Sequence, residues 1–203
     1  MDSEQKLKIV LATRNNDKIL EIREALKGLA IEILTMDQFP QIPEVIEDGQ
    51  TIAENALKKA KVVSDAIHLL ALADDTGLEV DYLGGRPGVY SSRFAGEGAT
   101  YDDNCNKLLQ LMKGVPQKQR AARFRCVIAI SGSDVERLVE GVCEGFITDE
   151  KRGSQGFGYD PVFYVPQYDL TFAQMSLTLK NEISHRGLAL KQARKILQQM
   201  IEA

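Results

Sequence analysis

The sequence has few of the residues that build zinc centres and disulfide frameworks. Its 203 residues include three cysteines, Cys105, Cys126 and Cys143, and two histidines, His68 and His185, and there is no tryptophan. No cysteines stand in a CxxC arrangement, and an odd number of cysteines without a signal peptide is typical of reduced, intracellular thiols. These absences argue against a disulfide-stapled secreted domain and against a zinc site.

Long apolar segments and an excess of positive charge are missing as well. Residues 1–8 are polar, and no apolar run approaches the roughly 20 residues that a membrane helix needs. The net charge is −4, which argues against a general nucleic-acid-binding surface, although a local basic pocket can still bind a small anion. We therefore expect a cytoplasmic protein with no membrane and no nucleic-acid partner.

The apolar residues that are present follow the pattern of an α/β protein. A β-branched apolar run at 7–12 precedes a polar turn, a helical repeat that ends near residue 28, and a second apolar run at 31–34. Strand, turn, helix, strand is the opening of an α/β fold. We expect one domain over residues 1–203, with a partly parallel sheet, helices around it and a cleft between two lobes.

The first candidate site follows the first strand. The carboxyl end of a strand that feeds a helix N-terminus is where α/β folds bind anions. The residues at this turn are Thr13, Arg14, Asn15, Asn16, Asp17 and Lys18. They could surround a phosphate, or they could form a helix cap with a surface lysine. The chain has no GxxxxGK[ST] segment, so an ordinary P-loop is excluded.

The second candidate site is acidic. Asp74 and Asp75 follow a short apolar run at 69–73, which we expect to be a buried strand ending in a turn that Asp74 caps. Adjacent carboxylates at such a place are costly unless they meet a cation or hydrogen-bond donors, and oxygen ligands suit Mg²⁺. An ordinary Asp-rich turn is the alternative. Glu47, Asp48 and Glu54 are further acidic candidates.

Two later segments could hold the rest of a ligand. In the glycine-rich stretch 153–161, Phe157 and Tyr159 could present an aromatic face to a base. Lys180 stands before a final helix that Ser184 is expected to cap, and two donors, His185 and Arg186, fall in its first turn. Cations there oppose the helix dipole, which hints at function. A flexible hairpin loop and a solvated helix start are the alternatives.

Together these segments resemble the inosine triphosphate pyrophosphatase family, which hydrolyses non-standard purine nucleotides. The segments are LATRNNDK at 11–18, EDGQTIAENALKKA at 47–60, ADDTGLEVDYLGGRPGVYSSRF at 73–94, GFGYDP at 156–161 and ISHR at 183–186. Three positions depart from the usual family pattern, namely Arg14, Ile52 and Gln155. They bear on triphosphate affinity and loop flexibility, and none removes a residue that the proposed chemistry needs.

The resemblance implies an elongated, two-lobed α/β fold with a central mixed sheet flanked by helices, and a homodimer. It implies hydrolysis of ITP, dITP and XTP to the monophosphate and pyrophosphate, with Mg²⁺ as the cofactor. By this resemblance Thr13, Asn15 and Lys18 bind the triphosphate, Glu47 and Asp75 hold the metal, Asp75 activates water and Thr76 contacts the nucleotide. Likewise Phe157, Gly158, Tyr159 and Asp160 hold base and sugar, and Lys180, His185 and Arg186 read the purine edge or contact phosphate. Two alternatives remain: a pyrophosphatase for modified pyrimidine or methylated nucleotides, and a nucleotide sensor without turnover.

Overall fold

The structure is a computed structural model that describes residues 6–202. The chain divides into two compact units. The first unit comprises the residues up to Asp75, Val127–Glu140 and the residues from Leu188 onward, and the second comprises Thr76–Cys126 and Gly141–Gly187. None of the helices within the described residues is long and apolar enough to cross a membrane.

The strands form one mixed sheet, as the sequence predicts. Their order is β2-β1-β3-β5-β6-β7-β8, and β4 pairs with β3 outside this path. β1 is parallel to β2 and to β3, whereas β7 is antiparallel to β6 and to β8. The bounds are Leu7–Leu11 (β1), Ile31–Thr35 (β2), Leu70–Val80 (β3), Pro87–Gly88 (β4), Ala121–Gly132 (β5), Val135–Ile147 (β6), Phe163–Val165 (β7) and Leu170–Thr171 (β8).

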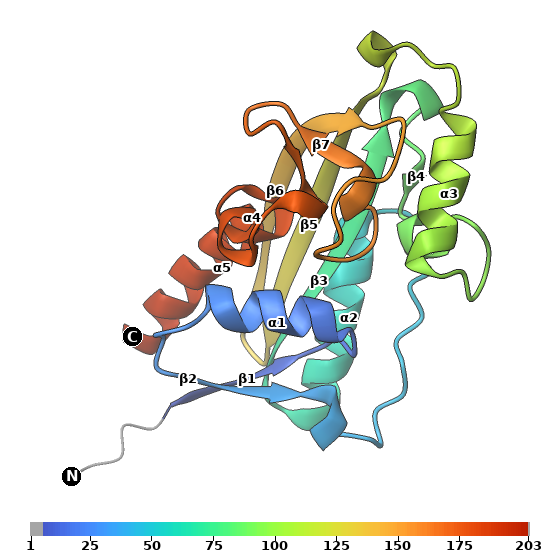
Figure 1. Ribbon diagram of the computed structural model, residues 1–203. Coiled ribbons are helices and arrows are strands. Elements are labelled where there is room, and N and C mark those ends of the chain that lie inside the picture. The colour runs from blue at the N-terminus through green and yellow to red at the C-terminus, as the bar shows by residue number, and fades with distance from the viewer. Residues whose placement is uncertain (1–5, 203) are drawn as a thin grey trace. The chain divides into compact units, whose positions relative to one another are not determined.

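In the first unit, helices cover both faces of the parallel strands. The chain runs from β1 through α1 (Asn16–Ala25) to β2, and then through α2 (Ile52–Ile67) to β3 on the other side of β1. Right-handed crossovers in opposite directions place their helices on opposite faces of a sheet, and α1 and α2 lie in this way (Figure 1). Arg194 of α5 (His185–Glu202) donates to carbonyl oxygens at the C-terminal end of α1.

The predicted strand at 69–73 is longer than expected. β3 runs from Leu70 to Val80 and includes the Asp74–Gly77 segment that the sequence assigns to a turn. Successive side chains of a strand point to opposite faces, so Asp74 and Asp75 can be neutralised by different elements. Both are almost fully buried, with 0% and 6% of their surface exposed. Buried carboxylates are unfavourable without partners, and the partners are distant in sequence, so the local sequence alone favours an exposed turn.

The second unit is built around a cluster of aromatic residues. Phe124, Phe163 and Phe172 pack with ring centroids 4.7–5.9 Å apart. The unit contributes the helices α3 (Tyr101–Leu111) and α4 (Leu177–Ile183), and the sequence analysis missed α4. Short 3₁₀ turns lie at Asp81–Leu83, Ser91–Arg93, Gln117–Gln119, Asp160–Val162 and Phe172–Gln174, and another at Met36–Gln38 in the first unit.

The start of α5 confirms the predicted cap. The Gly187 backbone N–H donates to Ser184 Oγ at 3.1 Å, which is the bond expected of an N-cap serine. Gly187 also has no room for a side chain, because an added Cβ would lie 2.0 Å from the Asn181 carbonyl oxygen of α4. The close contact between α4 and α5 therefore requires glycine here.

Candidate active site

The predicted phosphate-binding turn lies at the switch point of the parallel strands. Crossovers leave β1 toward β2 and return to β3 on its other side, and such folds bind ligands at the carboxyl ends of the strands flanking this point. Thr13 Oγ1 accepts a hydrogen bond from the Asn15 N–H at 3.2 Å. Asn15 caps α1, with its side-chain oxygen accepting from the N–H groups of Asp17 and Lys18. Arg14 instead donates to the Ile42 carbonyl oxygen.

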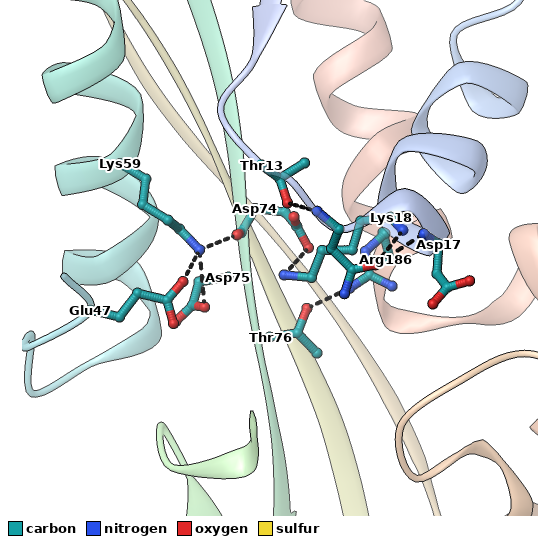
Figure 2. Close-up of polar contacts among 10 residues, drawn as sticks. Thr13, Asp17, Lys18, Glu47, Lys59, Asp74, Asp75, Thr76 and Arg186 are labelled. Carbon is teal, nitrogen blue, oxygen red and sulfur yellow. Dashed lines mark hydrogen bonds and ion pairs between the residues drawn. The ribbon is translucent and has the colours of Figure 1, made fainter. Parts of the chain in front are cut away.

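Asp74 is neutralised from the α1 side of β3. Lys18 Nζ lies 3.2 Å from Asp74 Oδ2, and the Asp74 side chain has no exposed surface while that of Lys18 is 15% exposed (Figure 2). The expectation that Asp74 caps a turn is therefore wrong, because Asp74 lies inside β3 and pairs with a lysine. This pair joins the turn after β1 to the neighbouring strand.

Asp75 is neutralised from the α2 side. Lys59 Nζ of α2 lies 3.3 Å from Asp75 Oδ1, 2.6 Å from Glu47 Oε1 and 2.6 Å from the Asp74 carbonyl oxygen (Figure 2). The two carboxylates assigned to Mg²⁺ thus converge on one ammonium group. The structure brings Glu47 and Asp75 together, although 28 positions separate them in sequence and Glu47 lies in the loop before α2.

Burial and charge act against each other in this cluster. Burial raises the pKa of the Asp75 carboxyl, and so do its neighbours Glu47 and Asp74, while Lys59 and Lys18 counteract this without cancelling it. For Lys59, burial acts to lower the pKa, but Asp75, Asp74 and Glu47 outweigh it and the pKa is raised. A carboxylate with a raised pKa is better suited to accept a proton at neutral pH.

Helix α2 also holds the loop that carries Glu47. The Asn55 side-chain oxygen accepts from the Gly49 N–H at 2.8 Å, and Lys58 Nζ lies 2.5 Å from Asp48 Oδ1. A Cβ added to Gly49 would lie 2.7 Å from the Asn55 oxygen, so this approach requires glycine. Thr51 and Glu54, three residues apart as the sequence motif of a capping box requires, form that capping box at the same helix start.

In the second unit, Asp160 closes the glycine-rich loop on itself. Asp160 Oδ2 accepts from the Phe157 N–H at 2.9 Å and from Lys180 Nζ at 2.6 Å. Lys180 stands before α5 as predicted, but it belongs to a helix of its own, α4, and only 3% of its surface is exposed. A Cβ at Gly156 would lie 2.0 Å from Asp160 Oδ2, which explains one of the loop glycines.

Tyr159 and Gly158 are tied to the core of the second unit. The Tyr159 ring is 4% exposed, and its hydroxyl donates to the Ser91 carbonyl oxygen at 2.9 Å. Burial raises the pKa of this hydroxyl. Cys105 Sγ donates to the Gly158 carbonyl oxygen at 3.2 Å. The Tyr159 side chain therefore packs inward, unlike the base-facing aromatic that the sequence suggested.

His185 and Arg186 are buried, with 3% and 2% of their surfaces exposed. The His185 ring stacks on Phe124 with centroids 4.4 Å apart and planes at 11°. Arg186 donates through Nη2 to Thr76 Oγ1 at 3.0 Å, as drawn in Figure 2, and its guanidinium lies 5.4 Å from the centre of the Phe157 ring. These residues form a preorganised group rather than the solvated helix start that was the alternative.

Comparison with known proteins decides the family. Residues 9–196 match the model of the Ham1 family. The chain belongs to the Ham1 family. A curated relative from Desulforamulus reducens, named dITP/XTP pyrophosphatase, is 52% identical over 195 residues, covering 96% of this chain and 97% of the relative. A relative of the same name from Caldanaerobacter subterraneus subsp. tengcongensis is 46% identical over 197 residues, covering 97% and 98%.

Solved structures of Ham1 proteins have the same fold. The Coxiella burnetii HAM1 protein superposes with a TM-score of 0.87 at 41% identity, covering 95% of this chain and 99% of that one. The Staphylococcus aureus Ham1 protein gives 0.85 at 38% identity, with coverage of 95% and 99%. Family membership and the mixed α/β fold therefore confirm the resemblance inferred from the sequence motifs.

Sequence reasoning missed Lys59, whose ammonium contacts Glu47, Asp74 and Asp75 in the acidic site. A signal was present. Lys59 lies on the apolar stripe of α2, between Ala56 and Ala60, both 0% exposed. A lysine on the buried face of an amphipathic helix must find a counter-charge, and the acidic candidates at 47 and 75 were the available partners.

Proposed function

We propose that this Ham1 protein hydrolyses ITP, dITP and XTP to the nucleoside monophosphate and pyrophosphate, and so keeps these nucleotides out of DNA and RNA. The observation that carries the proposal is the convergence of Glu47 and Asp75 on one cation position beside the turn from Thr13 to Lys18. The names of the D. reducens and C. subterraneus relatives support the substrate class.

The acidic site fits Mg²⁺. Its oxygens are the Glu47 and Asp75 carboxylates and the Asp74 carbonyl, all within 3.3 Å of one nitrogen atom. Mg²⁺ typically takes one or two carboxylates together with substrate phosphates. Within residues 6–202 no group of three or more His, Cys, Asp and Glu side chains could hold a metal. The acidic site therefore differs from a metal site whose ligands all come from the protein. Glu47 and Asp75 would hold the ion.

The chain's own residues supply the remaining chemistry. When bound, Mg²⁺ would supply positive charge where negative charge develops on the phosphates. The N-terminus of α1 offers backbone N–H groups and a positive dipole end to the triphosphate. Lys18 adds a cation at the same turn. Asp75, on the same strand as the buried Asp74, accepts the proton of the attacking water.

Base selection is assigned to the second unit. Hypoxanthine and xanthine carry a 6-keto acceptor, whereas adenine carries a 6-amino donor. Donors from His185 and Arg186 favour the keto group, and unmet or opposed donors disfavour adenine, which can cost orders of magnitude in efficiency. The Phe157 ring, whose centre lies 4.8 Å from the Lys180 ammonium and 5.4 Å from the Arg186 guanidinium, is the proposed surface for stacking of the base.

The protein is also proposed to act as a cytoplasmic homodimer. Tyr82 and Tyr90, in the 78–94 segment that carries the family motif, are 52% and 58% exposed. Such aromatic surface is enriched at interfaces. The three cysteines are free and buried, which fits a reducing compartment. Light scattering at micromolar concentration tests the assembly, and a monomeric mass would contradict it.

The decisive assay is product analysis with a nucleotide panel. Purified protein is given dITP, XTP, dATP, a modified pyrimidine triphosphate and a methylated purine triphosphate, with Mg²⁺ or with EDTA. We expect monophosphate and pyrophosphate from dITP and XTP in Mg²⁺ alone. Faster turnover of the pyrimidine or methylated substrate would favour the alternative pyrophosphatase, and tight dITP binding without products would identify a sensor.

A further inference from the structure

The ammonium of Lys59 is fully used inside the acidic site. An ammonium has three N–H donors, and Lys59 Nζ has oxygen atoms of Glu47, Asp74 and Asp75 at 2.6, 2.6 and 3.3 Å. Its side chain is only 9% exposed. The Lys59 ammonium is therefore hydrogen-bonded to these protein oxygens instead of to water.

The same oxygens are those assigned to the metal. The Asp75 side chain is 9% exposed and that of Glu47 31%, so two carboxylates face one another at a poorly hydrated place. Without a cation between them, burial and mutual repulsion would destabilise the folded protein. With Lys59 between them, a second cation meets repulsion and finds one oxygen of each carboxylate already in contact with the ammonium.

We propose that Lys59 is an internal cation that occupies the Glu47–Asp75 pair in the metal-free protein and must leave it when Mg²⁺ binds. The inference rests on the proposed function, because that function assigns Mg²⁺ to these two carboxylates. Lys59 thereby keeps the empty site folded and weakens the binding of Mg²⁺ to protein that holds no nucleotide.

The position of Lys59 suits such an exchange. Its backbone lies in the third turn of α2, whose start is fixed by the Thr51–Glu54 capping box. The ammonium ends a flexible four-carbon stem, so it can change position by side-chain rotation while the helix stays in place. The neighbouring Lys58 instead pairs with Asp48, and both side chains of this pair are exposed.

The test measures metal binding without nucleotide or turnover. Isothermal titration measures the Kd for Mg²⁺ of wild type, Lys59→Met and Lys59→Gln. Lys58→Met is the matched control, because it removes one lysine charge at the neighbouring position. Lys59→Gln keeps two N–H donors but no charge. We expect both Lys59 variants to bind Mg²⁺ at least about tenfold more tightly, within the range usual for coupled sites, and Lys58→Met to stay near wild type.

Thermal melts provide a second readout. In EDTA the Lys59 variants should melt below wild type, and Mg²⁺ should raise their Tm by more than it raises that of wild type. A Lys59→Met protein that folds only in Mg²⁺ also supports exchange, because the metal then does what the ammonium did. Unchanged or weaker Mg²⁺ binding in folded Lys59 variants, or equal tightening in Lys58→Met, would overturn the proposal.

The two proposals fail in different ways. If wild type releases pyrophosphate from dITP only with Mg²⁺ while the Lys59 variants bind the metal no more tightly, the exchange is wrong and the proposed function stands. If wild type forms no monophosphate and pyrophosphate from dITP in Mg²⁺, the proposed function fails, whatever the titrations show.

Discussion

Replacing Asp75 by Asn separates the chemistry of the site from its stability. The change keeps the shape of the side chain but removes its negative charge and nearly all of its basicity. Loss of a general base typically lowers the rate about 10²–10⁴-fold, which corresponds to about 3–5 kcal/mol in the barrier. Weaker metal binding should add to this loss, so kcat for dITP should fall at least about a hundredfold.

The structure predicts little change in stability for the same variant. Lys59 keeps its two shorter contacts, both 2.6 Å, to Glu47 and to the Asp74 carbonyl oxygen. A buried carboxylate is also replaced by a neutral group, which lowers the cost of burial. We expect the Tm in EDTA to stay within about 4 °C of wild type, the shift that about 1 kcal/mol produces in a domain of this size.

Asp74→Asn is the control variant, and the structure changes the effect on stability that we expect from it. Asp74 is fully buried against Lys18, so the change breaks a buried pair instead of a turn cap. Such losses cost about 3–5 kcal/mol. We expect the lower end, because Asn keeps an acceptor and Lys18 is 15% exposed. A loss of about 3 kcal/mol lowers Tm by about 6–12 °C.

The roles of the two aspartates are tested by measuring pyrophosphate release from dITP at saturating Mg²⁺ and the Tm of both variants. The reasoning on Asp75 is refuted if Asp75→Asn keeps more than about a tenth of wild-type kcat, well short of a general-base loss. A dead Asp74→Asn protein with wild-type Tm would show that the two roles are assigned the wrong way round.

Three further predictions address the metal, the base and the buried thiols. Hydrolysis should stop in excess EDTA and return with Mg²⁺, and full activity in EDTA would contradict the metal assignment. His185→Ala and Arg186→Ala should lose discrimination of dITP from ATP more than they lose phosphate binding; equal falls in kcat/KM for both substrates would show that neither residue reads the base. Burial raises the pKa of Cys105 and of Cys143 to about 11, so both should resist thiol reagents at pH 8. Because the folded pKa exceeds the unfolded value, the stability that the two thiols contribute is present below about pH 8.5 and is lost as the pH approaches 11. Thermal melts over this pH range measure the loss.

The parts of the fold that local chemistry determines were predictable from sequence. The Thr51–Glu54 capping box and the Ser184 cap are present, because each depends on residues within one turn of a helix. The turn after β1 was located for a similar reason: an apolar β-branched run followed by a polar cap leaves few alternatives. These features depend on neighbours in sequence, which a single chain displays.

What local sequence could not show is where buried charges find partners. The residues after the apolar run at 69–73 read as a turn because two carboxylates inside a strand are unfavourable alone. Lys18 and Lys59 make them acceptable, and these lie 56 and 16 positions away from Asp74 and Asp75. Helix α4 was missed in the same way, since Lys180 is stabilised by Asp160 from the glycine-rich loop.

The position of the Asp pair within a strand also decides which carboxylate can share a cation with Glu47. Two carboxylates at a turn could both point toward one metal, but neighbours in a strand point to opposite faces. Asp74 points toward α1 and meets Lys18, while Asp75 points toward α2 and meets the lysine that also holds Glu47. Only Asp75 lies on the face where a second carboxylate is available. The two aspartates are therefore not interchangeable, and the pleat of β3 is the reason why we propose Asp75, and not Asp74, as the metal ligand.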